Sequence, residues 1–186
     1  MIDIYYWRVT KYNPLNRDKN GFYKKNEWIS IGDIGTKYDN VEFTFDSYIF
    51  YENLYVDAVL KIMSVNKVES LKIEELKKSY YKSYVKKYKG LEKSYYSSYA
   101  DLSELETKKQ FDALKNNKLA SKHEIEKVIR FALREIIWCK LTCGQMFVHF
   151  GYDYYMYFGS ELYPKDVLET IEANGLFVED FVSPYL

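Results

Sequence analysis

Alternation between apolar and polar side chains predicts strands at both ends of the chain. Residues 4–12 (IYYWRVTKY) alternate loosely and are rich in aromatic and β-branched side chains, as expected of a strand with one solvated face. Residues 147–160 (FVHFGYDYYMYFGS) alternate on both sides of a glycine-led turn at 151–153, which predicts a β-hairpin. A final apolar run at 175–181 predicts one more strand.

The stretch that follows the first predicted strand carries turn-forming residues instead of a long periodic pattern. Residues 13–21 contain Asn-Pro and Asn-Gly among charged side chains, so they predict a surface loop. Residues 27–35 predict a short extended piece that ends in a turn, because their glycines tolerate positive φ.

Apolar residues three and four positions apart predict helices in the middle of the chain. From residue 44 this spacing predicts a helix of about four to five turns, with Asp46 or Ser47 as its cap. Ser121 and Glu124 match the reciprocal capping box of a second helix, which we expect to end at Gly144. This second helix is apolar on most of its sides, which indicates a central position.

The order of these elements predicts the fold class. A third, short helix is expected over residues 164–173, just before the last strand. Strand, helix, long helical region, helix, hairpin, helix and strand together favour an α+β fold with an antiparallel sheet of about four strands and helices packed on one face. We expect a single domain over residues 1–186, with a partly basic, Lys/Tyr-rich helical insertion at about 73–118.

The Lys/Tyr-rich part of the insertion is the strongest local anomaly of the sequence. Between residues 77 and 100, seven lysines against one glutamate give a net charge of +6, and seven tyrosines recur largely at helical spacings. Such a segment suits contact with an acidic protein surface, stacking on single-stranded nucleic acid, or a solvated helix that covers the domain. Nucleic acid is disfavoured because the segment contains no arginine. The residues predicted to contact a protein partner are Tyr80, Lys82, Tyr84, Lys86, Lys87 and Tyr88.

His149 and Asp153 form the candidate polar pair, because a hairpin turn at 151–152 places them near the turn on opposite strands. In one interpretation Asp153 polarises His149 as the general base of a small hydrolase or nuclease-like enzyme. In the other, the two side chains satisfy one another or present their polar edges to a partner. The second is favoured because no Ser or Cys lies in a nucleophile motif and no glycine-rich nucleotide loop occurs. We therefore expect no catalytic residue and no cofactor.

The two cysteines, Cys139 and Cys143, fall four positions apart within the helix expected at 121–144. They would share a helix face there, but they are poorly placed for a disulfide. A metal site made by these thiols with His149 is disfavoured, because a second cysteine pair is missing and buried free cysteine behaves as a small apolar residue. Reduced thiols and no bound metal are expected.

Composition and charge exclude several classes of protein. The chain has 47% hydrophobic and 29% charged residues, so it is expected to fold rather than remain disordered. Lys plus Arg and Asp plus Glu each number 27, so no overall field favours nucleic acid or an anionic membrane. The first residues lack the pattern of a signal peptide, and the most apolar stretch is too short and too charged to span a bilayer. We expect a cytoplasmic protein.

Motifs at both ends of the chain resemble a known group of proteins. The first part contains K-Y-N-P, R-D-x-N-G-x-Y, E-W-x-S-I and D-I-G, and the last part contains FVHFGYDYYMYFGS and NGLFVEDFVSPY. They resemble small bacterial immunity proteins encoded near polymorphic or contact-dependent growth inhibition toxins. The resemblance implies a protein that binds and blocks a cognate toxin domain, with no catalytic residues to transfer. A nucleic-acid-binding module and a small enzyme stay open as alternatives.

Overall fold

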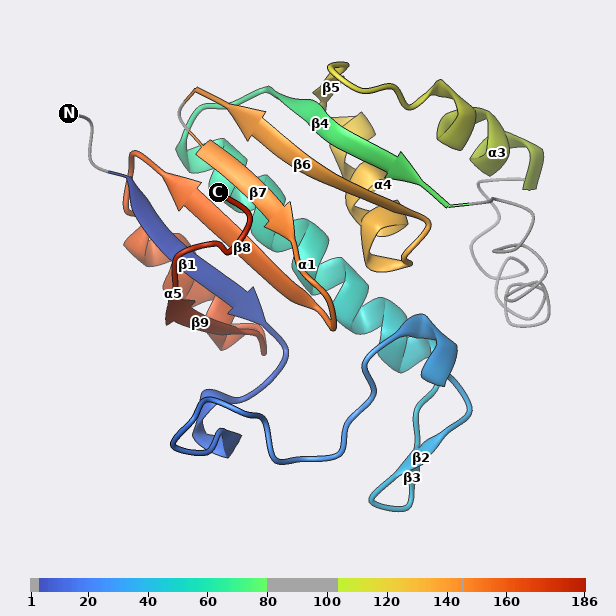
Figure 1. Ribbon diagram of the computed structural model, residues 1–186, viewed down its shortest axis with the longest axis vertical. Coiled ribbons are helices and arrows are strands. Elements are labelled where there is room, and N and C mark those ends of the chain that lie inside the picture. Colours follow the sequence, from blue (N-terminus) through green and yellow to red (C-terminus); the bar gives the residue numbers. More distant parts are fainter. Residues whose placement is uncertain (1–3, 80–103, 145) are drawn as a thin grey trace.

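The computed structural model describes residues 4–79, 104–144 and 146–186, which are arranged around one large antiparallel sheet (Figure 1). Single 3₁₀ turns occur at Pro14–Asn16 and Ile31–Asp33, and the short strands β2 (Lys37–Tyr38) and β3 (Val41–Glu42) pair only with each other. The main elements in chain order are β1 (Tyr5–Thr10), α1 (Phe45–Val65), β4 (Ser70–Lys78), α3 (Glu104–Ala113), β5 (Leu119–Ser121), α4 (Lys122–Leu133), β6 (Ile137–Cys143), β7 (Met146–Phe150), β8 (Tyr155–Ser160), α5 (Lys165–Ala173) and β9 (Phe177–Asp180).

The main sheet has the strand order β5-β4-β6-β7-β8-β1-β9, and every neighbouring pair is antiparallel. This confirms the α+β class and the antiparallel sheet. The expected size of about four strands is wrong, because the sheet has seven. The four predicted strands are β1, β7, β8 and β9, and the three that the pattern missed are β4, β5 and β6.

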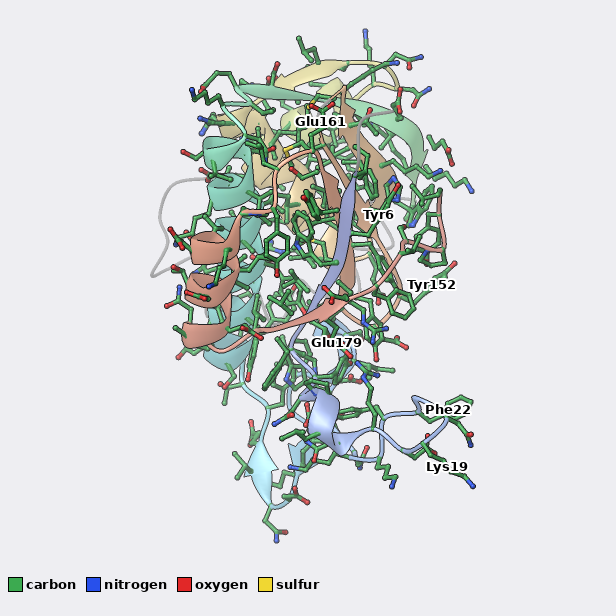
Figure 2. The ribbon with its side chains drawn as sticks, turned by 90° about the vertical axis from the view of Figure 1, so that its left-hand side faces the viewer. Tyr6, Lys19, Phe22, Tyr152, Glu161 and Glu179 are labelled. Atoms are coloured by element: carbon green, nitrogen blue, oxygen red, sulfur yellow. The ribbon has the colours of Figure 1, made fainter. Side chains whose placement is uncertain are left out.

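Helices α1, α4 and α5 cover one face of the sheet, as expected (Figure 1). Figure 2 shows the sheet nearly edge on, with α1 and α5 on one side and the labelled Tyr6 and Tyr152 directed to the other. The core fills the space between the helices and the inner face of the sheet. At its centre Trp7 of β1 and Phe158 of β8 are both fully buried and stack with their ring centroids 5.8 Å apart.

The helix predicted from residue 44 is present as α1, although its cap and length differ from the expectation. Thr44, rather than Asp46 or Ser47, is the N-cap, and its Oγ1 accepts a hydrogen bond from the backbone N–H of Ser47 at 3.2 Å. The helix has 21 residues, or about six turns at 3.6 residues per turn. Its buried face includes Tyr55, Val59 and other positions at helical spacing.

A buried ionic cluster joins α1 to α4. Glu52 of α1 is fully buried, and its carboxylate accepts hydrogen bonds from Arg134 at 2.6 and 2.8 Å and from Arg130 at 2.7 Å. Tyr48 donates a further hydrogen bond to this carboxylate at 3.1 Å. Burial alone would raise the pKa of Glu52, but the two guanidinium groups outweigh it and hold the pKa below its usual range. The cluster therefore fixes how α4 packs on α1.

The prediction of a single helix over residues 121–144 is wrong in its second half. Its start is confirmed, because Ser121 and Glu124 form the capping box, but α4 ends at Leu133. The chain then turns through Glu135, whose φ is 60°, and continues as strand β6. The apolar residues of β6 alternate as well as recurring at helical spacing, and pairing with β4 and β7 selects the strand.

The prediction of a helical insertion at about 73–118 is only partly right among the residues that the structure describes. The first part belongs to β4, which pairs with β5 and β6 and contains an irregularity between Glu74 and Lys77. The helix α3 covers only Glu104–Ala113, and residues 114–118 connect it to β5. The six predicted contact residues, Tyr80, Lys82, Tyr84, Lys86, Lys87 and Tyr88, lie outside the described residues.

Candidate binding surface

The hairpin predicted from the alternation of residues 147–160 is confirmed as β7 and β8. Its turn is closed by a hydrogen bond from Gly151 N to Tyr155 O at 2.7 Å and by one from Tyr155 N to Tyr152 O at 3.2 Å. Asp153 and Tyr154 both have positive φ, at 55° and 64°. Non-glycine residues enter this region at a cost, so the surrounding contacts must hold the turn in place.

The side chain of Tyr154 provides those contacts. Its hydroxyl donates to the Leu133 carbonyl at 2.9 Å, and its own carbonyl accepts a hydrogen bond from Tyr55 at 2.6 Å. Its ring meets Trp28 edge to face with centroids 4.8 Å apart. The hairpin tip is therefore attached to α1, to the end of α4 and to the loop before α1, which makes it a rigid element.

The outer face of the sheet, away from the helices, carries a continuous row of polar side chains. Strand register places these residues next to one another across six strands, because directly paired residues point to the same face. From β4 to β9 the row is Glu74, Lys140, His149, Tyr157, Arg8 and Glu179. At its far end Arg8 donates two hydrogen bonds of 2.9 Å to Glu179. Glu74 pairs with Lys72 and Lys140 pairs with Glu75, so the charges in the row are already paired.

His149 lies in the middle of this row and does not pair with Asp153. Its Nδ1 lies 2.8 Å from Ser183 Oγ, and its ring stacks on Phe147 with centroids 4.2 Å apart. Burial, together with the positive charge of Lys140, lowers the pKa of His149 to about 4. Within the described part of the chain no hydrogen bond or ion pair joins His149 to Asp153. The imidazole is therefore neutral at pH 7 and already engaged.

The C-terminal tail after β9 crosses the outer face over β8 and β7 (Figure 1). Phe181 packs on Tyr157, and the guanidinium carbon of Arg8 lies 4.2 Å from the centre of the Phe181 ring. Tyr185 meets the rings of Trp138 and Tyr157 at centroid distances of 5.8 and 5.9 Å. The tail thus covers His149 and brings Tyr185 beside β6, a contact that no sequence pattern predicts.

A cleft of about 620 Å³ opens where the hairpin tip, the tail and the end of β4 meet. Its walls also include the turn after α4 and the start of β6. Trp138 forms one wall, and its indole N–H donates to the Phe150 carbonyl at 2.9 Å, which fixes the ring. The aromatic residues that line the cleft are Trp138, Phe150, Tyr152, Tyr154, Tyr155 and Tyr185.

Charges of both signs border this cleft. Lys77 places its ammonium 5.1 Å from the centre of the Trp138 ring, and Lys78 donates to the Phe111 carbonyl of α3 at 2.6 Å. Burial lowers the pKa of Lys78. Asp153, on the hairpin turn, also lines the cleft. Tyr152 is 80% exposed at the hairpin tip, so the site combines a recessed aromatic surface with one projecting ring (Figure 2).

The residues of the N-terminal motifs build a second polar cluster, under the loop between β1 and α1. The ammonium of Lys11 is buried between the rings of Tyr12 and Trp28, at 3.8 and 4.2 Å, and lies 3.4 Å from Glu27. Burial lowers the pKa of Lys11 to about 8, although Glu27 and Asp33 oppose the shift. These motif residues hold the loop in place, and Lys11, Tyr12 and Trp28 are buried.

The two cysteines lie on strand β6 and not on a helix, so this expectation is corrected. Both are free. Four positions along a strand separate them by about 13 Å, too far for a disulfide. Cys139 is fully buried, and burial raises the pKa of its thiol to about 12. No group of three His, Cys, Asp or Glu side chains in the described residues is arranged to hold a metal ion.

Comparison with known proteins adds no relative to this description. The chain matches no family model, no curated protein and no solved structure. Among the helices that the structure describes, none combines the length and the apolar character needed to cross a membrane.

Proposed function

We propose that this chain is an immunity protein, which binds a cognate bacterial toxin domain and neutralises it by blocking the toxin's active site. The motif resemblance supports the toxin as the partner. The observation that carries the binding function is the aromatic cleft beside the exposed Tyr152. Tyr and Trp are the residues most often found to dominate the energy of protein interfaces.

Rigidity supports this assignment of the cleft. Trp138 is held by its hydrogen bond to the Phe150 carbonyl, and the tip that carries Tyr152 is attached to α1 and α4 through Tyr154. A partner that inserts a side chain here would lose little free energy to ordering of this surface. Lys77 beside the Trp138 ring favours a carboxylate or a polar edge of the partner near that wall.

The competing enzyme hypothesis requires His149 and Asp153 to act together as a base. His149 is instead bound to Ser183, covered by the tail and depressed in pKa to about 4, so it is a weak base without access to a substrate. The arrangement of these two side chains therefore favours the binding function over that enzyme.

Co-expression in a bacterial host tests the proposal. The proposal predicts that a large secreted protein is encoded next to this chain, and its C-terminal domain, expressed from an inducible promoter, is the toxin to be tested. Wild-type protein should restore growth, whereas a Trp138→Ala, Tyr152→Ala variant should fail to do so at equal abundance. Tyr163→Ala is the matched control, because Tyr163 is another exposed tyrosine (51%) but lies outside this cleft. Growth arrest that wild-type protein does not relieve would refute the immunity function.

A further inference from the structure

The loop between β1 and α1 presents apolar side chains to solvent. Leu15 is 89% exposed, Phe22 is 71% exposed and Ile29 is 48% exposed. Figure 2 shows Phe22 and Lys19 projecting from the loop on the same side of the molecule as Tyr152. A single exposed apolar residue is ordinary on a protein surface, but three in one ordered loop indicate a contact surface.

Hydrogen bonds within the loop order its tip. The backbone closes between Lys24 N and Asn16 O at 3.0 Å and between Asp18 N and Phe22 O at 2.9 Å. The Asp18 carboxylate accepts hydrogen bonds from the N–H groups of Asn20, at 2.8 Å, and Phe22, at 3.0 Å. Phe22 is therefore presented by a preorganised turn, which lowers the entropy that a partner must remove on binding.

The base of the loop is attached to the sheet. Arg17 lies between Glu179 of β9, whose carboxylate it contacts at 3.3 Å, and Tyr155 of β8, whose hydroxyl accepts a hydrogen bond from it at 3.0 Å. The ring of Tyr23 packs on that of Tyr12 with centroids 4.8 Å apart. The loop thus has a fixed position relative to the hairpin and its cleft.

The exposed charges next to Phe22 in the loop are positive, whereas Glu27 and Asp33 lie nearer to Ile29. Lys19, Lys24 and Lys25 are exposed, and none forms an ion pair with any residue that the structure describes. The neighbouring Asp18 directs its carboxylate into the hydrogen bonds of the loop itself. The tip therefore offers the exposed Phe22 ring together with three exposed lysines that are close to it in sequence.

We infer that residues 13–29 form a docking site for a protein whose surface carries an apolar pocket bordered by Asp and Glu side chains. Phe22 enters the pocket, and Lys19, Lys24 and Lys25 approach the surrounding carboxylates. The apolar centre supplies affinity and the charges supply orientation and association rate. The inference rests on the proposed function for the identity of the partner and adds the chemistry of the partner's surface.

A protein fits this surface better than nucleic acid or a membrane. The nearby arginines, Arg8 and Arg17, are both occupied by Glu179, and two of the three exposed apolar side chains are aliphatic and cannot stack on bases. The chain has equal numbers of acidic and basic residues, so no wider positive field holds the loop against an anionic bilayer.

Selection of random dodecapeptides displayed on phage, against the purified full-length chain, tests the inference without knowledge of the partner. The loop variant combines Phe22→Ala with Lys19→Glu, Lys24→Glu and Lys25→Glu. The control variant carries the same charge change at the exposed Lys67, Lys109 and Lys115. Peptides enriched on the wild type should combine Asp or Glu with a large apolar residue. They should bind the control variant equally and the loop variant about tenfold or more weakly.

Three results would overturn the inference. The first is a lack of acidic peptides among those enriched on the wild type, and the second is equal binding of the peptides to the wild type and the loop variant. The third is that oligothymidylate or phosphatidylglycerol vesicles, instead of peptides, bind in a way that depends on the loop.

Circular dichroism checks that the loop variant is folded, and Phe22→Ala alone replaces it if it is not. If the wild type and the loop variant both neutralise the neighbouring toxin equally, the loop is excluded from that interface while immunity stands. If the wild type fails to neutralise the toxin, the proposed immunity function is refuted, and the peptide selection still tests whether the loop is a docking site.

Discussion

Replacement of Glu52 by glutamine tests whether the buried ionic cluster holds α4 on α1. The variant keeps the size of the side chain but leaves Arg134 and Arg130, at 2.6 and 2.7 Å, facing a neutral amide. Loss of one partner of a buried ion pair costs about 3–5 kcal/mol. The side chains of Arg130 and Arg134 are 31% and 15% exposed, so water offsets part of this, and we expect about 3 kcal/mol.

Urea unfolding followed by circular dichroism measures this loss. With a slope of about 2 kcal/mol/M, the midpoint should fall by about 1.5 M without a change in slope. Glu69→Gln is the matched control, because Glu69 pairs with Lys122 at 2.8 Å but is 79% exposed, and it should cost less than about 1 kcal/mol. Similar small losses for both variants would refute the role assigned to the cluster.

The pH dependence of the Glu52 effect has a definite sign. The pKa of Glu52 is lower in the folded protein than in the unfolded chain, where it is about 4.3. The stabilisation that the charged Glu52 provides is therefore complete above about pH 4.3 and is lost as the pH falls through the folded-state pKa. The difference in unfolding free energy between wild type and Glu52→Gln should therefore shrink below about pH 4.3. A constant difference down to pH 3 would contradict the depressed pKa.

Three more predictions follow from single contacts. Gly159→Ala should destabilise the protein by about 1–3 kcal/mol, measured by thermal melting, because its Cβ would lie 2.1 Å from the Phe147 ring, which is stacked on His149. The pKa of His149 is about 4 in the folded state, below its unfolded value of about 6.5. As the pH is lowered from about 6.5 to about 4, the unfolding free energy measured by urea titration should therefore fall, by at most about 1.4 kcal/mol per pH unit. The His149→Gln variant should lack this dependence on pH. Iodoacetamide should label the half-buried Cys143 in the native protein, whereas Cys139 should react only on unfolding, as mass spectrometry would show; equal rates would contradict its burial.

The parts of the fold that could be predicted are those where local pattern and tertiary pairing agree. The β7–β8 hairpin alternates on both sides of Gly151, and the turn falls there. The capping box of Ser121 and Glu124 likewise marks the true start of α4. In both cases the residues that define the element also satisfy its hydrogen bonds, so a local reading of the sequence suffices.

The strands β4 and β6 could not be separated from helices by local pattern. In β6 the residues Ile137, Cys139 and Leu141 alternate in burial, yet with their neighbours they also extend the helical stripe of α4. The helix gives way to the strand at Arg134 and Glu135, where the sequence contains no glycine or proline to indicate the end of a helix. Only pairing with neighbouring strands, which lie up to 70 residues away, decides between the two structures.

The candidate site depends on contacts between distant segments. His149 and Asp153 were selected because they are close in sequence, but the partner of His149 is Ser183, in the tail. The cleft joins the end of β4, the turn after α4, the hairpin and Tyr185, and each segment is unremarkable by itself. Residue type and spacing indicated the hairpin part of this site, but tertiary packing adds the other segments, for which the sequence pattern carried no signal.

Binding of a toxin domain at the cleft is tested most directly by isothermal titration calorimetry. The purified toxin domain that the proposal predicts to be encoded next to this chain is titrated with wild type, Tyr152→Ala and Tyr163→Ala. We expect tight binding by wild type and Tyr163→Ala, and an affinity at least about 30-fold lower for Tyr152→Ala, which corresponds to the loss of a central aromatic contact of about 2 kcal/mol. No binding by the wild type, or equal affinities for all three proteins, would contradict toxin binding at this surface.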